Sequence, residues 1–573
     1  MAPLDFRNVN SLWGSVLVET LSRLGLRQAV VSPGSRSTPL AIALARHPGI
    51  EAIPVLDERS AGFFALGLAR RKGEPVLLVC TSGTAGANYF PAVIEASESG
   101  VPLLVITADR PPEMRACASG QTIDQQKLFG GYPNFYHELA LPGAAEPLLA
   151  YLRQTLAHAF GRTLHPTPGP VHLNAPFRDP LAPVADGTAE PAAAAVDWDA
   201  FFDFVAPPAG IECAAPLPSL GPDVHGIIVA GPAQPADPAG YAAAVGEIGR
   251  KLGWPVLADG LSPVRQHANL IPHLVTAYDA LLRNPAFAAR VRPETVLCLG
   301  GWPTSKVLRD WLQAGAARTW LVGTRPDNRD ALHGRTRPLP VAVPALAAGL
   351  PAAGAPNGYT PLWTDAEKRA RAVLDRTLAD EAALFEPKAA WLLDRHLPAG
   401  TPIFIANSMP VRDVEYVCGG GERRLRAFGN RGANGIDGTL STAMGVAHGG
   451  PPAVLLTGDL ALLHDANGFL LRPRLRGSLT VVLINNRGGG IFEHLPVAQF
   501  DPPFEEFFAT PQEVDFAGLA SAHGAAHILV RDWDHFTSLI SALPAAGVRV
   551  LEVRTDRKRD AAGRRRLLVA ASS

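Results

Sequence analysis

Two pairs of polar residues in the last third of the chain have the composition and spacing of a metal-binding site. Gly458-Asp459 follows an apolar run at residues 453–457, and Asn485-Asn486 follows a second run at residues 479–484. The separation between the pairs suits one helical crossover between neighbouring parallel strands. A carboxylate and an amide oxygen would then lie side by side at the sheet edge. Both are hard ligands that suit Mg²⁺, which takes the rest of its shell from water and phosphate.

Three glycines at residues 488–490 come directly after Asn486 and Arg487. Their bare backbone could give a carbonyl ligand and approach a diphosphate closely. Taken alone, Asp459 has a structural alternative as a helix cap and Asn486 as a turn residue. Together, at crossover spacing, they favour a metal–diphosphate site.

Glu58 is a second acidic residue at the end of an apolar run, here at residues 53–56. Its structural alternative is an N-cap acid at the start of a helix over residues 60–71, which the helix dipole favours. Glu58 alone therefore predicts little, and its interpretation depends on the metal–diphosphate residues.

The composition excludes several classes of protein. The chain has 573 residues and a formal net charge of −1, which argues against a strongly basic nucleic-acid binder and a polybasic membrane clamp. No apolar run approaches the length of a membrane span, and no signal-peptide pattern opens the chain. Five cysteines without a CxxC pair fit a reducing compartment. We expect a cytoplasmic globular protein that binds neither nucleic acid nor membrane.

Short apolar runs, each followed by a glycine-rich turn and a helical pattern, recur in three groups. They predict buried strands of doubly wound parallel sheets. The expected strands are 28–32, 52–56, 75–81, 102–107 and 170–174, then 225–230, 255–257, 295–299 and 318–322, then 402–406, 425–428, 453–457, 479–484 and 548–553. Ala- and Pro-rich stretches at 180–218 and 338–356 are interpreted as linkers. The prediction is three α/β domains, at residues 1–185, 215–345 and 365–573, with an internal echo between the outer two.

The metal–diphosphate pattern resembles that of thiamine-diphosphate enzymes, which have Gly-Asp, a helical crossover and then Asn-Asn. The resemblance implies that the first domain binds the cofactor's pyrimidine ring and the third its diphosphate. It implies that Asp459, Asn486 and the backbone of Gly488 hold Mg²⁺ or Mn²⁺. Glu58 would hydrogen-bond the aminopyrimidine ring, a proton-sharing role that suits a carboxyl whose pKa burial has raised. Ile436 would be the apolar wedge that holds the cofactor bent.

Further segments look like the menaquinone-pathway synthase family in particular. They are Ser32-Pro33-Gly34-Ser35-Arg36-Ser37-Thr38-Pro39, Thr107-Ala108-Asp109-Arg110-Pro111-Pro112-Glu113, Gln121-Thr122-Ile123-Asp124-Gln125, Asn407-Ser408-Met409-Pro410-Val411-Arg412 and Asn430-Arg431-Gly432-Ala433-Asn434-Gly435-Ile436-Asp437-Gly438. That family joins 2-oxoglutarate to isochorismate, both dianions. Arginine is the natural partner for their carboxylates because its fork matches a carboxylate bidentately.

The resemblance assigns residue roles. Catalytic roles fall to Glu58, Gln121 and Arg36. Cofactor-binding roles fall to Glu58, Ser408, Met409, Ile436, Gly458, Asp459, Asn486, Gly488 and Ile491. Substrate-binding roles fall to Ser35, Arg36, Arg110, Gln121, Lys306, Ser408, Arg412, Arg431, Ile491 and Phe492. The family also implies a homodimer or homotetramer with its sites at the chain interface.

Two other functions remain open from the sequence. A different thiamine-diphosphate enzyme, such as acetolactate synthase or a 2-oxoacid decarboxylase, would keep Glu58 and the metal residues without needing Arg36, Arg412 and Arg431 together. A non-catalytic nucleotide-binding protein would have no use for Glu58. The chain has no P-loop and no strand-linked GxGxxG, so ATPase and dehydrogenase activities lack support.

Overall fold

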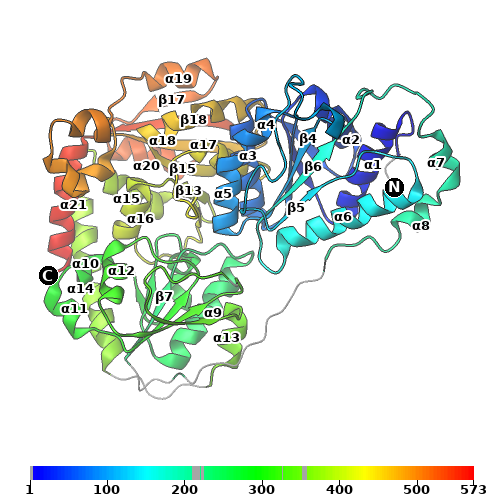
Figure 1. The fold of residues 1–573 in the computed structure, drawn as a ribbon. Helices are drawn as coiled ribbons and strands as arrows, with labels where there is room; N and C mark the ends of the chain where they lie inside the picture. The colour runs from blue at the N-terminus through cyan, green and yellow to red at the C-terminus, as the bar shows by residue number, and fades with distance from the viewer. Residues whose placement is uncertain (1–3, 209–219, 221–224, 326, 352–357) are drawn as a thin grey trace. The chain divides into compact units, whose positions relative to one another are not determined.

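The computed structural model describes residues 4–208, 220, 225–325, 327–351 and 358–573. The chain forms two compact units. Unit 1 comprises Met1–Ile211 with two segments of the C-terminal third, Asn430–His448 and Asp465–Leu475. Unit 2 comprises Glu212–Gly429, Gly449–His464 and Arg476–Ser573. Figure 1 shows both units as layers of helix and strand, and each is described by itself.

Unit 1 is built on a six-stranded parallel sheet with the order β2-β1-β3-β4-β6-β5. Its strands are β1 (Gln28–Val31), β2 (Glu51–Pro54), β3 (Val76–Cys80), β4 (Leu103–Asp109), β5 (Phe135–Glu138) and β6 (Pro170–Pro176). The central strands are apolar throughout because helices cover both faces of the sheet. The strand order reverses between β1 and β3, where ligands of such sheets bind, at the carboxyl ends.

Helices on both faces bury the sheet of unit 1. They are α1 (Val9–Arg23), α2 (Thr38–Arg46), α3 (Glu58–Lys72), α4 (Thr84–Asn88), α5 (Phe90–Ser99) and α6 (Glu146–Leu164). In the C-terminal segment α17 (Thr439–Ala447) packs directly on α3. A Cβ on Gly67 of α3 would lie 2.1 Å from the carbonyl oxygen of Thr442. The two backbones can therefore approach this closely only because a glycine stands there.

The first sheet of unit 2 has the order β12-β11-β10-β7-β8-β9 and is parallel throughout. Its strands are β7 (Gly226–Ala230), β8 (Val256–Ala258), β9 (Leu274–Val275), β10 (Thr295–Leu299), β11 (Arg318–Val322) and β12 (Arg335–Leu339). The helices of this part are α9 (Pro238–Leu252), α10 (Tyr278–Leu282), α11 (Pro285–Arg290), α12 (Lys306–Gln313) and α13 (Val343–Gly349). This strand order is that of the dinucleotide-type doubly wound fold.

The second sheet of unit 2 has the order β14-β13-β15-β16-β18-β17, which repeats the order found in unit 1. Its strands are β13 (Pro402–Ile405), β14 (Arg426–Phe428), β15 (Ala453–Gly458), β16 (Ser478–Asn485), β17 (Ala526–Leu529) and β18 (Gly547–Arg554). The main helices around it are α14 (Tyr359–Asp380), α15 (Glu386–His396), α16 (Met409–Val417), α18 (Asp459–His464), α19 (Phe516–Ala522), α20 (Trp533–Ser541) and α21 (Arg557–Ala571). The shared order supports the internal echo seen in the sequence.

The three doubly wound parallel sheets confirm the predicted fold class. The linker interpretation is partly wrong, because α7 (Glu190–Ala195), α8 (Trp198–Phe202) and α13 lie within the stretches assigned to linkers. Phe201 and Phe202 are buried in the core of unit 1, so apolar residues among the alanines and prolines hold this segment in place. Residues 209–218 and 352–356 of these stretches lie outside the described residues, as does Cys213.

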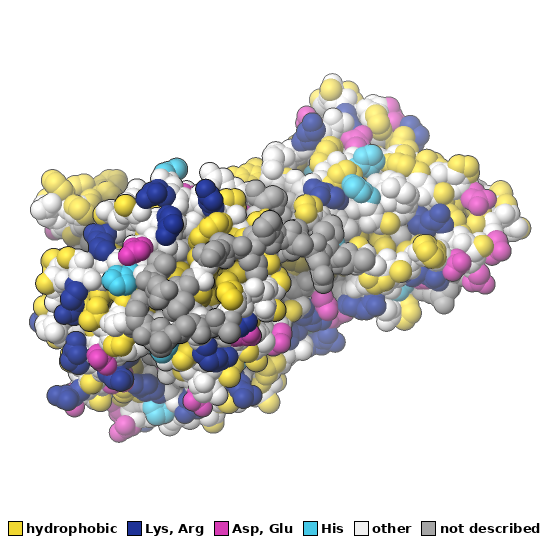
Figure 2. Space-filling view, turned by 90° about the horizontal axis from the view of Figure 1, so that it is seen from below, with side chains coloured by type: hydrophobic (Ala, Val, Ile, Leu, Met, Phe, Trp, Pro, Cys, Tyr) yellow, Lys and Arg dark blue, Asp and Glu magenta, His cyan; other side chains and the backbone are white. Residues whose placement is uncertain are grey.

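Figure 2 shows basic and acidic side chains interspersed on the face that it displays. No helix in the described part of the chain is long and apolar enough to cross a membrane.

Candidate active site

The predicted metal residues meet at one edge of unit 2. Asp459 begins α18 directly after β15, and Asn486 follows the neighbouring strand β16. The Asp459 carboxylate accepts hydrogen bonds from the backbone N–H groups of Gly488 and Leu460, each at 2.8 Å. Burial raises the pKa of Asp459 to about 6, although these backbone donors lower it. The parallel neighbours therefore bring the two side chains together as the spacing predicts.

The side chain of Asn486 has one satisfied end and one unsatisfied end. Its Nδ2 donates to Oε1 of Glu386 at 2.8 Å. Its Oδ1 is buried and has no hydrogen-bond partner among the described residues. A buried oxygen without a partner is costly unless a ligand satisfies it. The orphaned oxygen beside an anchored carboxylate fits a hard divalent cation.

The glycines after Asn486 allow the loop to close over this edge. Gly488 has φ +129°, and a Cβ there would lie 2.3 Å from the carbonyl oxygen of Ala509. Only glycine fits such a position. Among the described residues no three His, Cys, Asp or Glu side chains form a metal-binding group. A cation at this edge would therefore rely on one carboxylate, one amide, backbone and phosphate oxygens.

Helix α16 begins beside this edge, after β13. Ser408 precedes it with φ +69°, an uncommon backbone conformation for a residue other than glycine. Arg412 Nη1 donates to the carbonyl oxygen of Ser408 at 2.6 Å, and burial lowers the pKa of Arg412. Met409 is buried at the first turn of the helix. The N-cap residue Ser408 and the first turn of the helix, with Met409 and Arg412, thus carry three of the predicted site residues.

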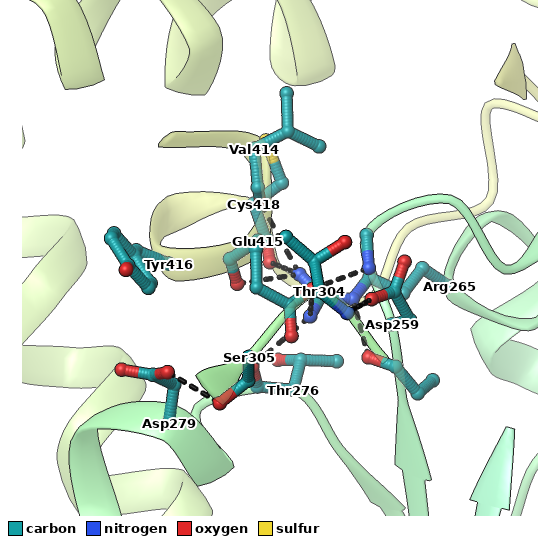
Figure 3. A network of polar contacts seen from close by, with 12 residues as sticks. Asp259, Arg265, Thr276, Asp279, Thr304, Ser305, Val414, Glu415, Tyr416 and Cys418 are labelled. Atoms are coloured by element: carbon teal, nitrogen blue, oxygen red, sulfur yellow. Dashed lines mark hydrogen bonds and ion pairs between the residues drawn. The ribbon is translucent and has the colours of Figure 1, made fainter. Parts of the chain in front are cut away.

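The other end of α16 is anchored by a buried polar network that the sequence does not reveal (Figure 3). Arg265 donates to the carbonyl oxygens of Glu415 and Cys418 at 3.1 and 2.6 Å, and to Glu415 Oε2 at 3.0 Å. The Tyr278 hydroxyl donates to the other oxygen of Glu415. Burial and nearby Asp259 raise the pKa of Glu415 to about 8, although Arg265 and Tyr278 lower it. The network fixes the helix that carries Arg412.

In the same network Asp259 and Asp279 hold the segment before α12. Asp259 accepts from the backbone N–H of Thr304 at 2.6 Å, and Asp279 from the Ser305 hydroxyl at 2.5 Å. Lys306, the next residue, is exposed and pairs with Asp310 at 2.6 Å. That contact is an ordinary helix-surface ion pair, so the substrate role of Lys306 stays a prediction.

Unit 1 brings a second set of predicted residues together at the carboxyl edge of its sheet. Arg36 is buried in the turn after β1, and its Nη1 donates to the carbonyl oxygen of Phe177 at 2.8 Å. Arg110 follows β4 and donates to the Ser82 hydroxyl, while Gln121 Nε2 donates to the Ser82 carbonyl at 3.0 Å. Burial and the charge of Arg36 lower the pKa of Arg110. Ser35, beside Arg36, is exposed.

Both arginines at this edge keep donors unused. The Nε atoms of Arg36 and Arg110 are buried and have no hydrogen-bond partner in the described part of the chain. The positive charges of Arg36 and Arg110 repel each other, and the Asp179 carboxylate, 3.7 Å from Arg36 Nη1, offsets part of that repulsion. The arrangement suits a carboxylate ligand.

Glu58 is the first residue of α3 and is half-buried in this structure. The N-cap is Asp57, whose carboxylate accepts from the backbone N–H of Ser60 at 3.1 Å. Glu58 is therefore not the capping acid that its structural alternative supposes. Burial raises the pKa values of Cys80 and Tyr89, and the charge of Glu58 adds to both shifts. Glu58 therefore lies close enough to Cys80 and Tyr89 for its charge to act on both.

The loop that carries Arg431 belongs to unit 1. The backbone N–H groups of Gly432 and Ala433 donate to Glu95 at 3.0 and 2.7 Å, and Glu95 pairs with Arg70 at 3.0 Å. Ile436, further along the loop, is half-buried. The sequence does not reveal Glu95 because its contacts with this loop span 337 and 338 residues, and Arg70, 25 residues from Glu95, joins the cluster through Glu95.

Ile491 and Phe492 follow the glycines in unit 2 and are half-buried. The ring of Phe492 meets Phe508 edge to face with centroids 5.8 Å apart. Gly458, at the end of β15, has open space where a Cβ would stand. These residues are placed where the sequence expects them, and their ligand contacts stay predictions.

Three parts of the chain match the three domains of thiamine pyrophosphate enzymes. Residues 13–128 match the thiamine pyrophosphate enzyme N-terminal TPP binding domain, 222–405 the middle domain, and 422–553 the C-terminal TPP binding domain. The fold and the oxygen-lined edge thus define a thiamine-diphosphate-dependent enzyme. A 2-succinyl-5-enolpyruvyl-6-hydroxy-3-cyclohexene-1-carboxylate synthase of Synechococcus sp. (strain JA-3-3Ab) is 56% identical, over 97% of this chain and 96% of the relative.

Synthases of the same name from Acaryochloris marina and a Nostoc strain are 52% and 53% identical, each over 98% of both chains. The chain therefore belongs to the family of 2-succinyl-5-enolpyruvyl-6-hydroxy-3-cyclohexene-1-carboxylate synthases. The resemblance drawn from the sequence motifs is confirmed.

Proposed function

We propose that the chain decarboxylates 2-oxoglutarate and adds the remaining four-carbon unit to isochorismate. The product is 2-succinyl-5-enolpyruvyl-6-hydroxy-3-cyclohexene-1-carboxylate, an intermediate of menaquinone biosynthesis, and carbon dioxide leaves. The observation that carries the proposal is the orphaned Asn486 oxygen beside the anchored Asp459 carboxylate. The family membership above favours this carbon–carbon bond-forming transferase over acetolactate synthases and simple 2-oxoacid decarboxylases.

Asp459, Asn486 and the backbone of Gly488 would hold Mg²⁺ or Mn²⁺ against the cofactor's diphosphate. Thiamine diphosphate, when bound, supplies the electron sink for loss of carbon dioxide. Met409 and Ile436 would contribute apolar surface to its rings. Glu58 would share a proton with a nitrogen of the aminopyrimidine ring. This proton sharing is how a carboxyl group can drive the acid–base step.

The arginines would hold the two dianionic substrates. Arg36 and Arg110 have spare N–H donors on one edge, and Gln121 and Ser35 are neutral donors near them in the chain. Arg412 and Arg431, with Ser408, would meet the remaining carboxylates, and Ile491 and Phe492 would exclude water. Excluding water strengthens each charge-assisted contact.

We further propose a cytoplasmic homodimer or homotetramer with its sites at the chain interface. The family resemblance supports the oligomer. The sparse cysteines and the absence of a spanning helix in the described residues support the location.

The experiment is the loss of isochorismate absorbance with purified protein, 2-oxoglutarate, thiamine diphosphate and Mg²⁺. Each component is left out in turn. We expect loss only when every component is present. No loss of isochorismate, with carbon dioxide released from another 2-oxoacid, would move the assignment to a different enzyme of the class.

Glu58→Gln tests the proton-sharing role. The amide keeps the shape of the side chain and cannot take up a proton, so we expect turnover to fall at least about 100-fold. Thiamine diphosphate binding and the circular dichroism spectrum should stay close to those of the unmodified protein. Unimpaired turnover would remove Glu58 from the mechanism.

A further inference from the structure

The amide of Asn486 can act as a metal ligand only in one of its two orientations. Its oxygen and its NH₂ group have nearly the same shape but opposite polarity. If the amide turned by half a rotation, the NH₂ group would face the cation and repel it. Something in the protein must therefore select the orientation.

Glu386 has the properties of the selecting group. It begins α15, is only 3% exposed, and accepts from Asn486 Nδ2 at 2.8 Å through Oε1. Its Oε2 accepts from Arg564 Nη2 at 2.9 Å. Because both oxygens accept hydrogen bonds, the carboxylate offers residue 486 no proton. Only an NH₂ group can face it, which turns Asn486 Oδ1 away towards the metal edge.

Arg564 holds Glu386 in place from the C-terminal helix α21. The guanidinium is 2% exposed and grips Asp413 bidentately at 2.6 and 2.9 Å. Its Nη1 lies 3.1 Å from His494 Nε2. The backbone N–H of Glu386 is held by Asp560 at 3.1 Å. Asp413 neighbours Arg412 on α16, so one arginine ties the metal edge to the helix of a predicted substrate arginine.

We propose that Glu386, held by Arg564, is a positioning residue that fixes the Asn486 amide with its oxygen towards the cofactor's metal ion. The inference rests on the proposed function and deepens it by naming the group that orders the metal ligand. Groups that orient metal ligands in this way commonly change metal affinity 10- to 100-fold when they are altered.

The test exchanges the polarity of the pair. In Glu386→Gln the new amide gives its oxygen to Arg564, so its NH₂ group faces residue 486. Asn486 then turns its oxygen to Gln and its NH₂ group to the metal. In the double variant Glu386→Gln/Asn486→Asp, the aspartate accepts from that NH₂ group with one oxygen and offers the metal the other.

The measurement is the affinity of Mg²⁺ with thiamine diphosphate, followed by titration calorimetry on the full chain. We expect Glu386→Gln to bind about 10- to 100-fold more weakly and the double variant to recover to within a few-fold of the unmodified protein. Asn486→Asp alone sets two carboxylates face to face and should bind more weakly than the double variant. This last comparison stands even if Glu386→Gln alone does not fold.

The chain offers a matched control one residue away. Asn485 Nδ2 donates to Oε1 of Glu552 at 2.8 Å, and Glu552 is 1% exposed. Glu552→Gln therefore makes the same change beside an asparagine with no assigned metal role, and we expect its affinity to stay within a few-fold. The inference would be overturned if Glu386→Gln bound Mg²⁺ with thiamine diphosphate as tightly as the unmodified protein. It would also be overturned if the double variant bound no more tightly than either single variant. Failure of the unmodified protein to bind the cofactor would instead overturn the proposed function.

Discussion

The buried arginines of unit 2 differ from those at the sheet edge of unit 1. In unit 2 every guanidinium nitrogen of Arg265 and Arg564 has a hydrogen-bond partner. In unit 1 Arg36 and Arg110 each keep a buried Nε without a partner among the described residues. Arg265 and Arg564 hold helices and loops in place, whereas Arg36 and Arg110 combine spare donors with a position at the carboxyl edge of the sheet, which suits a ligand. The spare Nε alone does not mark a site, because Arg371 of unit 2 has one and still donates to two backbone carbonyls. The difference distinguishes the arginines that stabilise the fold, here called the frame, from the arginines placed to bind a ligand, here called the site.

Arg265→Met should have the largest effect on stability. It removes the guanidinium beside Glu415, whose carboxyl is ionised above its pKa of about 8, and leaves carbonyl groups at the end of α16 without a donor, so the comparison is made at pH 9. Breaking a buried pair from one side costs about 3–5 kcal/mol, to be measured as a lower urea midpoint. Glu415→Gln added to Arg265→Met should recover part of the loss. Arg376→Met, on the exposed face of α14, is the control and should stay within about 0.5 kcal/mol. If Arg265→Met lowered the free energy of unfolding as little as the control does, Arg265 would not be a stabilising arginine and the contrast with unit 1 would fail.

His172 tests a buried group that has no charged partner. It lies in β6 of unit 1, its Nε2 is 2.8 Å from the Thr107 hydroxyl, and burial lowers its pKa to about 3. The unfolded chain binds this proton below about pH 6.5, while the folded chain does not. The part of the unfolding free energy that depends on neutral His172 is therefore fully present above pH 6.5 and is lost as the pH falls towards 3.

At pH 5 the free energy of unfolding is lower by about 2 kcal/mol than at pH 7 because of this one group. His172→Gln, which can still donate to Thr107, should remove this part of the acid sensitivity. The check is the difference in unfolding free energy between the two proteins at pH 7 and pH 5. Equal acid sensitivity of both would show that His172 is not the group responsible.

Arg110→Ala should have the smallest effect on stability. Arg110 faces Arg36, whose charge adds to burial in lowering its pKa. Removing it relieves the repulsion from Arg36, and costs the hydrogen bond to Ser82 and the attraction of Asp109 and Asp179, so we expect a change within about 0.5 kcal/mol. If Arg110→Ala lowered the free energy of unfolding as much as Arg265→Met does, Arg110 would be an arginine that stabilises the fold and would not be reserved for a ligand.

The sequence predicts those features that depend on neighbouring residues. Fully apolar central strands stand out, and Asp459 and Asn486 come together because each directly follows one of two adjacent strands. The strands β5, β9, β12 and β17 escape prediction because they are short edge strands that are not fully buried. Glu386 and Arg564 escape it too, because their pairing spans most of the third domain and leaves no local pattern.

The most direct test of the division between frame and site compares Asp459→Asn with Arg110→Ala in two titrations. The first measures thiamine diphosphate with Mg²⁺, and the second measures 2-oxoglutarate on the cofactor-loaded protein. We expect Asp459→Asn to lose affinity for thiamine diphosphate with Mg²⁺. Arg110→Ala should keep cofactor affinity and bind 2-oxoglutarate about 10- to 100-fold more weakly, the value of a charge-assisted hydrogen bond. Equal loss of cofactor affinity in both variants would contradict this division.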